Sequence, residues 1–168
     1  MTAIVLFGIQ FSLSLLAYSL AAVWYVVPRL DRLPVVVALQ PLLWVHVFRI
    51  AGGTILAPGS VGPGVPDDFQ KMIGYGDMIT AVAALVALVA LRAHVRAAIP
   101  LVWLVIVVGT VDTVNAIIQS MRYDVFTHVL GLNWVIVTLY VPALLVSSVL
   151  IVLQLLRKER PAAQRLGP

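Results

Sequence analysis

Seven polar side chains stand inside long apolar stretches of this sequence and could do chemistry there: Gln10, His46, Arg49, Asp77, Thr80, Asp112 and Asn115. Ionisable groups in apolar surroundings are costly, and within membranes they commonly bind ligands, ions or protons. Arg49 stays protonated, so one of Asp77 and Asp112 is expected to pair with it. The other aspartate would then balance a protonated His46 or act as a proton or cation site.

Helix geometry places these groups in one layer. At a rise of about 1.5 Å per residue, a residue eight positions from a helix end lies about 12 Å from that end. Counted from the expected helix ends, that depth is reached by Gln10, Arg49, Thr80 and Asp112, with Asp77 about one turn shallower and His46 about one turn deeper.

The same groups also recur at helical spacing. Residues at i, i+3 and i+7 share one face of an α-helix. In a membrane a polar face turns toward the other helices, because lipid cannot form hydrogen bonds with its polar groups. Such stripes are formed by His46–Arg49–Gly53, Asp77–Thr80–Ala84 and Asp112–Asn115–Gln119. Asn133 and Tyr140 in the last apolar stretch are expected to complete the ring.

Composition identifies the solvent of the chain. The 168 residues are 62% hydrophobic and only 11% charged, whereas a soluble domain has roughly 25% charged residues. Lipid must therefore be the main solvent. With no cysteine in the sequence, disulfides and thiolate sites are excluded. The net charge of +4 does not indicate nucleic-acid binding, because the basic residues lie at the ends of apolar segments rather than on one solvated face.

Five apolar segments are each close to the roughly 20 residues that a membrane-spanning helix needs. They cover about 2–27, 34–57, 67–91, 98–120 and 132–156. The first is expected to be a retained helix that ends at Pro28, and the Pro/Gly-rich stretch 58–66 is expected to be irregular. The sequence thus predicts an all-α fold, a single five-helix transmembrane domain over 1–156 and a basic cytoplasmic tail over 157–168.

The distribution of arginine and lysine predicts the orientation. Eight basic residues fall at one face and two, Lys71 and Arg122, at the other; the eight are Arg29, Arg32, Arg92, Arg96, Arg157, Lys158, Arg160 and Arg165. Positive residues favour the cytoplasmic side. The N-terminus is therefore expected outside and the C-terminus inside, with the polar layer in the outer half.

Cofactor chemistry has little support in the residues. A bis-histidine heme site needs two histidines at matched depth, and His46 has such a partner only if His128 folds inward. The apolar segments contain no lysine for a Schiff base, apart from Lys71 at a segment end, and no metal-spaced carboxylate pair stands out. No metal site, cofactor or catalytic residue is therefore predicted, and an enzyme is the less favoured class.

Three short motifs resemble a known group of proteins. They are Phe48-Arg49 followed by Gly52-Gly53, the run Gly74-Tyr75-Gly76-Asp77 after Pro66, and Tyr140-Val141-Pro142. Together they are similar to an uncharacterised group of small bacterial five-helix inner-membrane proteins. The resemblance implies a multi-pass protein of the bacterial inner membrane and implies no activity.

The function expected from the residues is binding or transport of a small ligand, ion or proton in an outward-facing polar cavity. Arg49 would meet an anionic group or pair with Asp112. Asp77 and His46 would exchange protons or bind the ligand. The 58–66 loop would cover the mouth of the cavity. The first alternative is an accessory or assembly subunit of a larger membrane complex, in which the polar groups only fix helix register, at about 0.6 kcal/mol each. A heme-binding or other redox protein is a lesser alternative. The expected partners are lipid and a small ligand or ion, with a larger complex or a homo-oligomer as further options.

Overall fold

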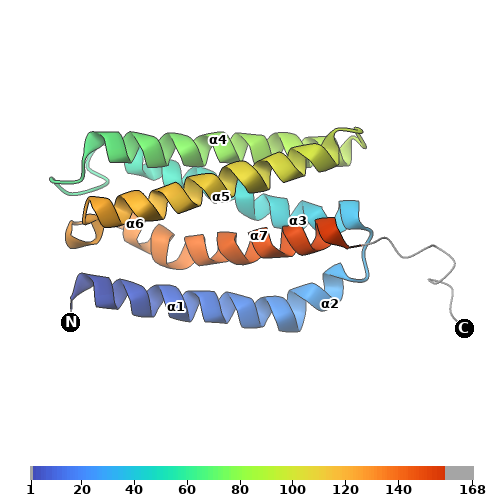
Figure 1. The fold of residues 1–168 in the computed structure, drawn as a ribbon, viewed down its shortest axis with the longest axis horizontal. Coiled ribbons are helices and arrows are strands. Elements are labelled where there is room, and N and C mark those ends of the chain that lie inside the picture. Colours follow the sequence, from blue (N-terminus) through green and yellow to red (C-terminus); the bar gives the residue numbers. More distant parts are fainter. Residues whose placement is uncertain (1, 158–168) are drawn as a thin grey trace, which may run out of the picture.

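A computed structural model describes residues 2–157, and over that range the chain is helical without any strand (Figure 1). Five helical stretches of the described chain are long and apolar enough to cross a membrane: Ala3–Leu30, Val35–Leu56, Asp67–Arg92, Ala98–Arg122 and Leu132–Leu156. The predicted number and approximate limits of the apolar helices are confirmed. The predicted tail lies outside the described residues except for Arg157.

The first stretch does not end at Pro28 as predicted. It consists of α1 (Ala3–Ala21), a π-helical segment η1 (Ala22–Val26) and α2 (Val27–Leu30). A proline ring clashes with the carbonyl four residues back in a regular α-helix. In the wider π turn, the N–H of Val27 bonds to the carbonyl of Ala22, five residues back. The chain therefore remains helical through Pro28.

The second stretch changes its winding halfway along. It begins as α3 (Val35–Val47) and continues as η2 (Phe48–Leu56), a 3₁₀-helix of 9 residues. Runs of 3₁₀-helix longer than three or four residues are uncommon, and their three residues per turn align every third side chain. Arg49, Gly52 and Ile55 accordingly share the buried face of η2. The predicted stripe is thus wrong in its last member, because Gly52 rather than Gly53 follows Arg49 on this face.

The other three stretches complete the bundle. They are α4 (Asp67–Arg92), α5 (Ala98–Arg122) and a last helix made of α6 (Leu132–Val135), the π-helical segment η4 (Ile136–Tyr140) and α7 (Val141–Leu156). A short 3₁₀ turn, η3 (Val125–Thr127), lies in the loop after α5. Pro142 follows a π segment just as Pro28 does.

The helices α3, α4, α5 and α7 pack together, and α1 lies along one side of them (Figure 1). The main core is formed mostly by residues of these four helices, with Ala22 and Leu30 added from η1 and α2, and small side chains such as Ala84 and Ala87 on α4 let the helices pack closely. On α1, Ser14 is the one buried residue. The first helix is thus attached to the bundle by the least buried surface.

The two ends of the bundle differ in character. The N-terminus and the loops 57–66 and 123–131 lie at one end, called here the loop end, and the short turns 31–34 and 93–97 lie at the other (Figure 1). At the turn end, Arg157 donates hydrogen bonds to the carbonyls of Leu30 at 3.2 Å and Leu33 at 2.6 Å. Those bonds tie the last helix to the turn after α2.

The two long loops pack against each other. Val65 is buried with Phe69, Val125 and Leu130 in a second apolar cluster. The N–H of Gly62 also donates to the carbonyl of Val129 at 2.7 Å. The 58–66 stretch contains no helix, as predicted, and the two loops form one cap on this end of the bundle.

Candidate functional site

Arg49 is the centre of a buried charge cluster. Its Nε donates to Asp77 on α4, and one Nη2 N–H donates to Asp112 on α5. A second Nη2 N–H donates to the hydroxyl of Thr113 at 3.1 Å, and Nη1 donates to the carbonyl of Gly109 at 3.1 Å. The 3₁₀ winding of η2 directs this side chain inward, where its side chain is only 5% exposed.

The expectation that a single aspartate pairs with Arg49 is therefore wrong. Both carboxylates contact the guanidinium, which offers five N–H donors in a planar fork and can serve two acceptors at once. We call Arg49, Asp77 and Asp112 the charge cluster. Its formal charge is one positive against two negative groups, so one negative charge is left over.

Three glycines make room for the charge cluster. A Cβ at Gly52 would overlap the carboxylate of Asp77, and a Cβ at Gly76 would overlap that of Asp112. A Cβ at Gly109 would lie 3.3 Å from Nη1 of Arg49. Each of the three helices thus contributes one charged residue and one glycine that leaves room for a charged residue of a neighbouring helix.

The glycines and charges form a closed cycle between the helices. Asp77 of α4 lies over Gly52 of η2, Asp112 of α5 lies over Gly76 of α4, and Arg49 approaches Gly109 of α5. Side-chain-free positions permit close helix approach. Here they also leave space for the charged groups of the neighbouring helix.

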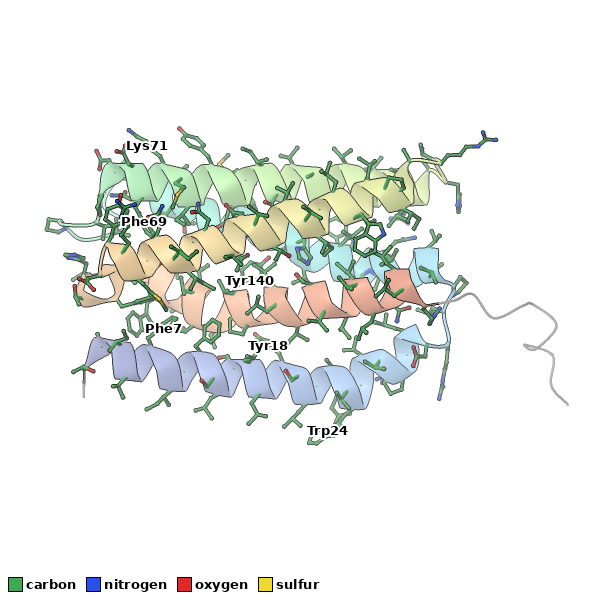
Figure 2. The ribbon with its side chains drawn as sticks, viewed as in Figure 1. Phe7, Tyr18, Trp24, Phe69, Lys71 and Tyr140 are labelled. Atoms are coloured by element: carbon green, nitrogen blue, oxygen red, sulfur yellow. The ribbon has the colours of Figure 1, made fainter. Side chains whose placement is uncertain are left out.

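A cavity of about 310 Å³ extends from the charge cluster toward the loop end. Arg49, Asp77, Asp112 and Thr113 form its polar end. Most of its walls are apolar, and five aromatic side chains line it: Phe7, Phe11, Phe69, Phe126 and Tyr140. Figure 2 shows Phe7, Phe69 and Tyr140 between the helices, whereas Trp24 points away from the bundle. The site is an apolar pocket with one charged end.

Tyr140 links the last helix to the change of winding beside Arg49. Where an α-helix tightens into a 3₁₀-helix, the acceptor moves from four residues back to three, so a carbonyl at the junction loses its backbone donor. The hydroxyl of Tyr140 donates to the carbonyl of Val45 at this junction. About one turn earlier in α3, the carbonyl of Leu42 accepts a hydrogen bond from the hydroxyl of Ser147 at 3.0 Å. Two side chains of the last helix therefore support α3 where the arginine is positioned.

Tyr140→Phe is expected to lower the free energy of unfolding by about 1 kcal/mol, because a carbonyl at the junction loses its donor. Tyr75→Phe is the matched control, since Tyr75 is exposed on α4 and its hydroxyl makes no hydrogen bond within the described residues. Unfolding of the purified protein in detergent, followed by tryptophan fluorescence, measures both variants. Equal stability of the two would contradict a supporting role for the hydroxyl.

His46 lies deeper than the charge cluster and does not line the cavity. The residue is 1% exposed, and neither ring nitrogen has a hydrogen-bond partner within the described chain. A buried polar group without a partner costs about 1–3 kcal/mol. His46 therefore does not balance an aspartate in this structure, since both carboxylates bond to Arg49.

Two other predicted site residues lie apart from the charge cluster. Gln10 is exposed on α1 and accepts a hydrogen bond from Nε1 of Trp134 at 2.7 Å. Asn115 turns toward α4, where its amide contacts the sulfur of Met72 at 3.1 Å. Neither lines the cavity.

Thr80 and Asn133 are buried, as predicted, but their polar groups form hydrogen bonds within the protein that stabilise the fold. The hydroxyl of Thr80 donates to the carbonyl of Gly76 at 2.9 Å, and its methyl group lies close to Gly109. The amide of Asn133 donates to the carbonyl of Ser60 at 3.2 Å, and its oxygen accepts from Thr54. Asn133 also lines the cavity, so it connects the loop cap to the site.

Thr113 is the polar partner of Arg49 that the sequence interpretation omitted, and the phenylalanines that line the cavity were not predicted either. It accepts from Arg49 and donates to the carbonyl of Gly109 at 2.8 Å. Its position next to Asp112 and four residues after Gly109 was the available signal. A threonine hydroxyl in a helix readily bonds to the carbonyl four residues back.

The 58–66 loop does not line the cavity, and its expected role in covering the mouth stays a prediction. The lining residues of the loop end come from 125–130 instead, and the 58–66 loop packs behind them. His128 lies against Gly64 in this cap, whereas His46 lies within α3. The described residues therefore do not bring two histidines together, and they contain no group of three His, Asp or Glu side chains placed to hold a metal ion.

Comparison with known proteins identifies a family, and the description of that family assigns no activity or ligand. The model of a family described as "Domain of unknown function (DUF8737)" matches residues 6–156. No curated protein and no solved structure matches the chain.

Proposed function

The chain belongs to the DUF8737 family of unknown function, and we propose that it is a multi-pass membrane protein that binds a small ligand in the cavity at its charge cluster. Five apolar helices support the membrane location. Large apolar side chains such as Ile79, Val111 and Leu153 are exposed on the outside of the bundle, where lipid would cover them. The resemblance in sequence favours the bacterial inner membrane.

The charge distribution supports an N-out, C-in orientation. Arg29, Arg32, Arg92, Arg96 and Arg157 lie in or beside the turn end, and Lys71 and Arg122 lie near the loop end. By the positive-inside rule the turn end faces the cytoplasm. The cavity then lies in the outer half of the membrane, below the loop cap.

The observation that carries the proposal is the cavity that ends on charged groups. Residues that only fix helix register need one ion pair and no space beside it. Here both carboxylates are partly exposed, 14% for Asp77 and 16% for Asp112, and both line a space of about 310 Å³. Ligand sites are typically apolar pockets with a few convergent polar groups. Binding is the function that this arrangement favours over a purely structural role.

Native mass spectrometry of the protein from lipid nanodiscs tests the proposal. The wild type is expected to retain a non-lipid molecule that the variant Ala116→Phe does not retain. Ala116 lines the cavity one turn from Asp112, so a phenylalanine there fills the space. Ala21→Phe, at an exposed position of α1, is the matched control and should retain the molecule. Identical spectra for all three proteins would count against a ligand cavity, and a stoichiometric protein partner in the wild type alone would favour an accessory subunit.

A further inference from the structure

We infer that the ligand of this cavity is an organic cation whose charged head meets Asp77 and Asp112 and whose apolar body fills the aromatic-lined space. The inference rests on the proposed function and names its ligand class. Three independent features of the described residues support it: the charge of the lining, its free hydrogen-bonding capacity and the chemistry of its walls.

The charge of the lining is negative. Among the lining residues, Asp77 and Asp112 are the acidic groups and Arg49 is the basic one. Other cations of the described chain do not compensate: Lys71 points away from the bundle in Figure 2, and His46 does not line the cavity. With both aspartates ionised, one unit of negative charge remains in apolar surroundings, where the ionised form persists only beside a counter-charge. A cationic ligand would neutralise it.

The free hydrogen-bonding capacity consists mainly of acceptors. Arg49 has five N–H donors, and four of them bond to Asp77, Asp112, Thr113 and the Gly109 carbonyl. Each carboxylate bonds to Arg49 through one oxygen. The other oxygens, Asp77 Oδ2 beside Gly52 and Asp112 Oδ1 beside Gly76, accept no hydrogen bond from the described residues, and both side chains keep a partly exposed side. An anionic ligand would compete with both carboxylates for the guanidinium. A cation instead uses the capacity that is left.

The walls suit the body of such a ligand. Phe7 and Phe11 from α1, Phe69 from α4 and Phe126 from the loop cap surround the space. Phe7 and Phe126 are packed together, with ring centroids 4.1 Å apart. Aromatic faces attract ammonium groups and pack against apolar groups. An ammonium carried on a ring or a short chain matches both parts of the cavity, whereas a hydrated metal ion would leave the apolar walls unused.

Isothermal titration calorimetry with benzyltriethylammonium tests the ligand class, and benzenesulfonate serves as the anion of similar ring size. The wild type in nanodiscs is expected to bind the cation and not the anion. Asp77→Asn and Asp112→Asn should each weaken cation binding at least tenfold, because each leaves a neutral pair with Arg49. Both variants retain an acceptor for the guanidinium, so they are expected to fold. Ala116→Phe blocks the space without touching a charge and should also abolish binding.

The outcomes separate this inference from the proposed function. Cation binding that is equally strong in both asparagine variants would overturn the assignment of the head group. Binding of benzenesulfonate instead of the cation would overturn the ligand class and leave a binding cavity. A further outcome is that neither probe binds while native mass spectrometry still finds a molecule that the wild type retains and Ala116→Phe loses. That result would overturn the cationic ligand class and leave the binding function standing. If no molecule is retained either, both the class and the binding function fail.

Discussion

Arg49→Met is expected to lower the free energy of unfolding by about 3–5 kcal/mol, which is the usual cost of removing one partner from a buried ion pair. The variant leaves Asp77 and Asp112 facing each other in apolar surroundings without a counter-charge. Thr113 and the Gly109 carbonyl also lose the hydrogen bonds that Arg49 donates to them. Denaturation of the purified protein, followed by the fluorescence of its four tryptophans, gives the value.

Two further variants separate the loss of charge from the loss of side-chain volume. Arg122→Met changes the same residue type at the exposed end of α5 and should alter the stability by less than about 0.5 kcal/mol. The triple variant Arg49→Met with Asp77→Asn and Asp112→Asn removes all three charges and should recover much of the lost stability. A single Arg49→Met variant as stable as Arg122→Met would contradict a buried charge cluster.

Gly76→Ala is expected to destabilise the protein by about 3 kcal/mol, the upper part of the range for overpacking a well-filled site. The added methyl group would occupy the space that the Asp112 carboxylate takes up in the structure. Asp112 would then have to leave Arg49 or push α4 and α5 apart. Chemical denaturation measures the loss of stability, and cation binding measures the loss of the site.

Gly8→Ala is the matched control for this substitution. Gly8 also lies inside a helix, and a Cβ there would have no atom within 4 Å. The change should be neutral or stabilise the protein by up to about 1 kcal/mol through helix propensity. If Gly76→Ala behaved like Gly8→Ala, the close approach of Asp112 to α4 would be refuted. Combining Gly76→Ala with Asp112→Ala should restore part of the stability, because the two groups then no longer overlap.

The helices and the buried charges were predictable from the sequence because they depend on composition. Apolar runs of about 20 residues can hardly form anything but spanning helices in lipid. Inside such runs an arginine needs acidic partners, which makes the pairing of Arg49 with aspartate predictable. The involvement of both aspartates was not predictable, because it depends on helix packing around Gly52 and Gly76.

The winding of the second helix was also hidden from the sequence. At α-helical spacing, Gly53 would share the face of Arg49. In the 3₁₀ segment, Gly52 shares that face instead. The hydroxyl of Tyr140, which follows its acceptor Val45 by 95 residues, supports the end of α3 from which that segment begins. Gln10 was placed in the polar layer by its depth, and Asn115 by its helical spacing from Asp112. Neither criterion says which neighbour a side chain contacts, and these two contact Trp134 and Met72.

Cysteine accessibility measures most directly whether the cavity at the charge cluster opens to the outer side of the membrane. The chain has no cysteine, so a single introduced thiol gives an unambiguous signal. Ala116→Cys places the thiol in the cavity, and Ile118→Cys places one on the exposed outer side of α5 two residues away, at nearly the same depth. A charged, membrane-impermeant thiol reagent added to intact cells should label the first variant and not the second, and benzyltriethylammonium should slow that labelling. Labelling of Ala116→Cys only in inverted vesicles, or equal labelling of both variants, would contradict an outward-facing cavity.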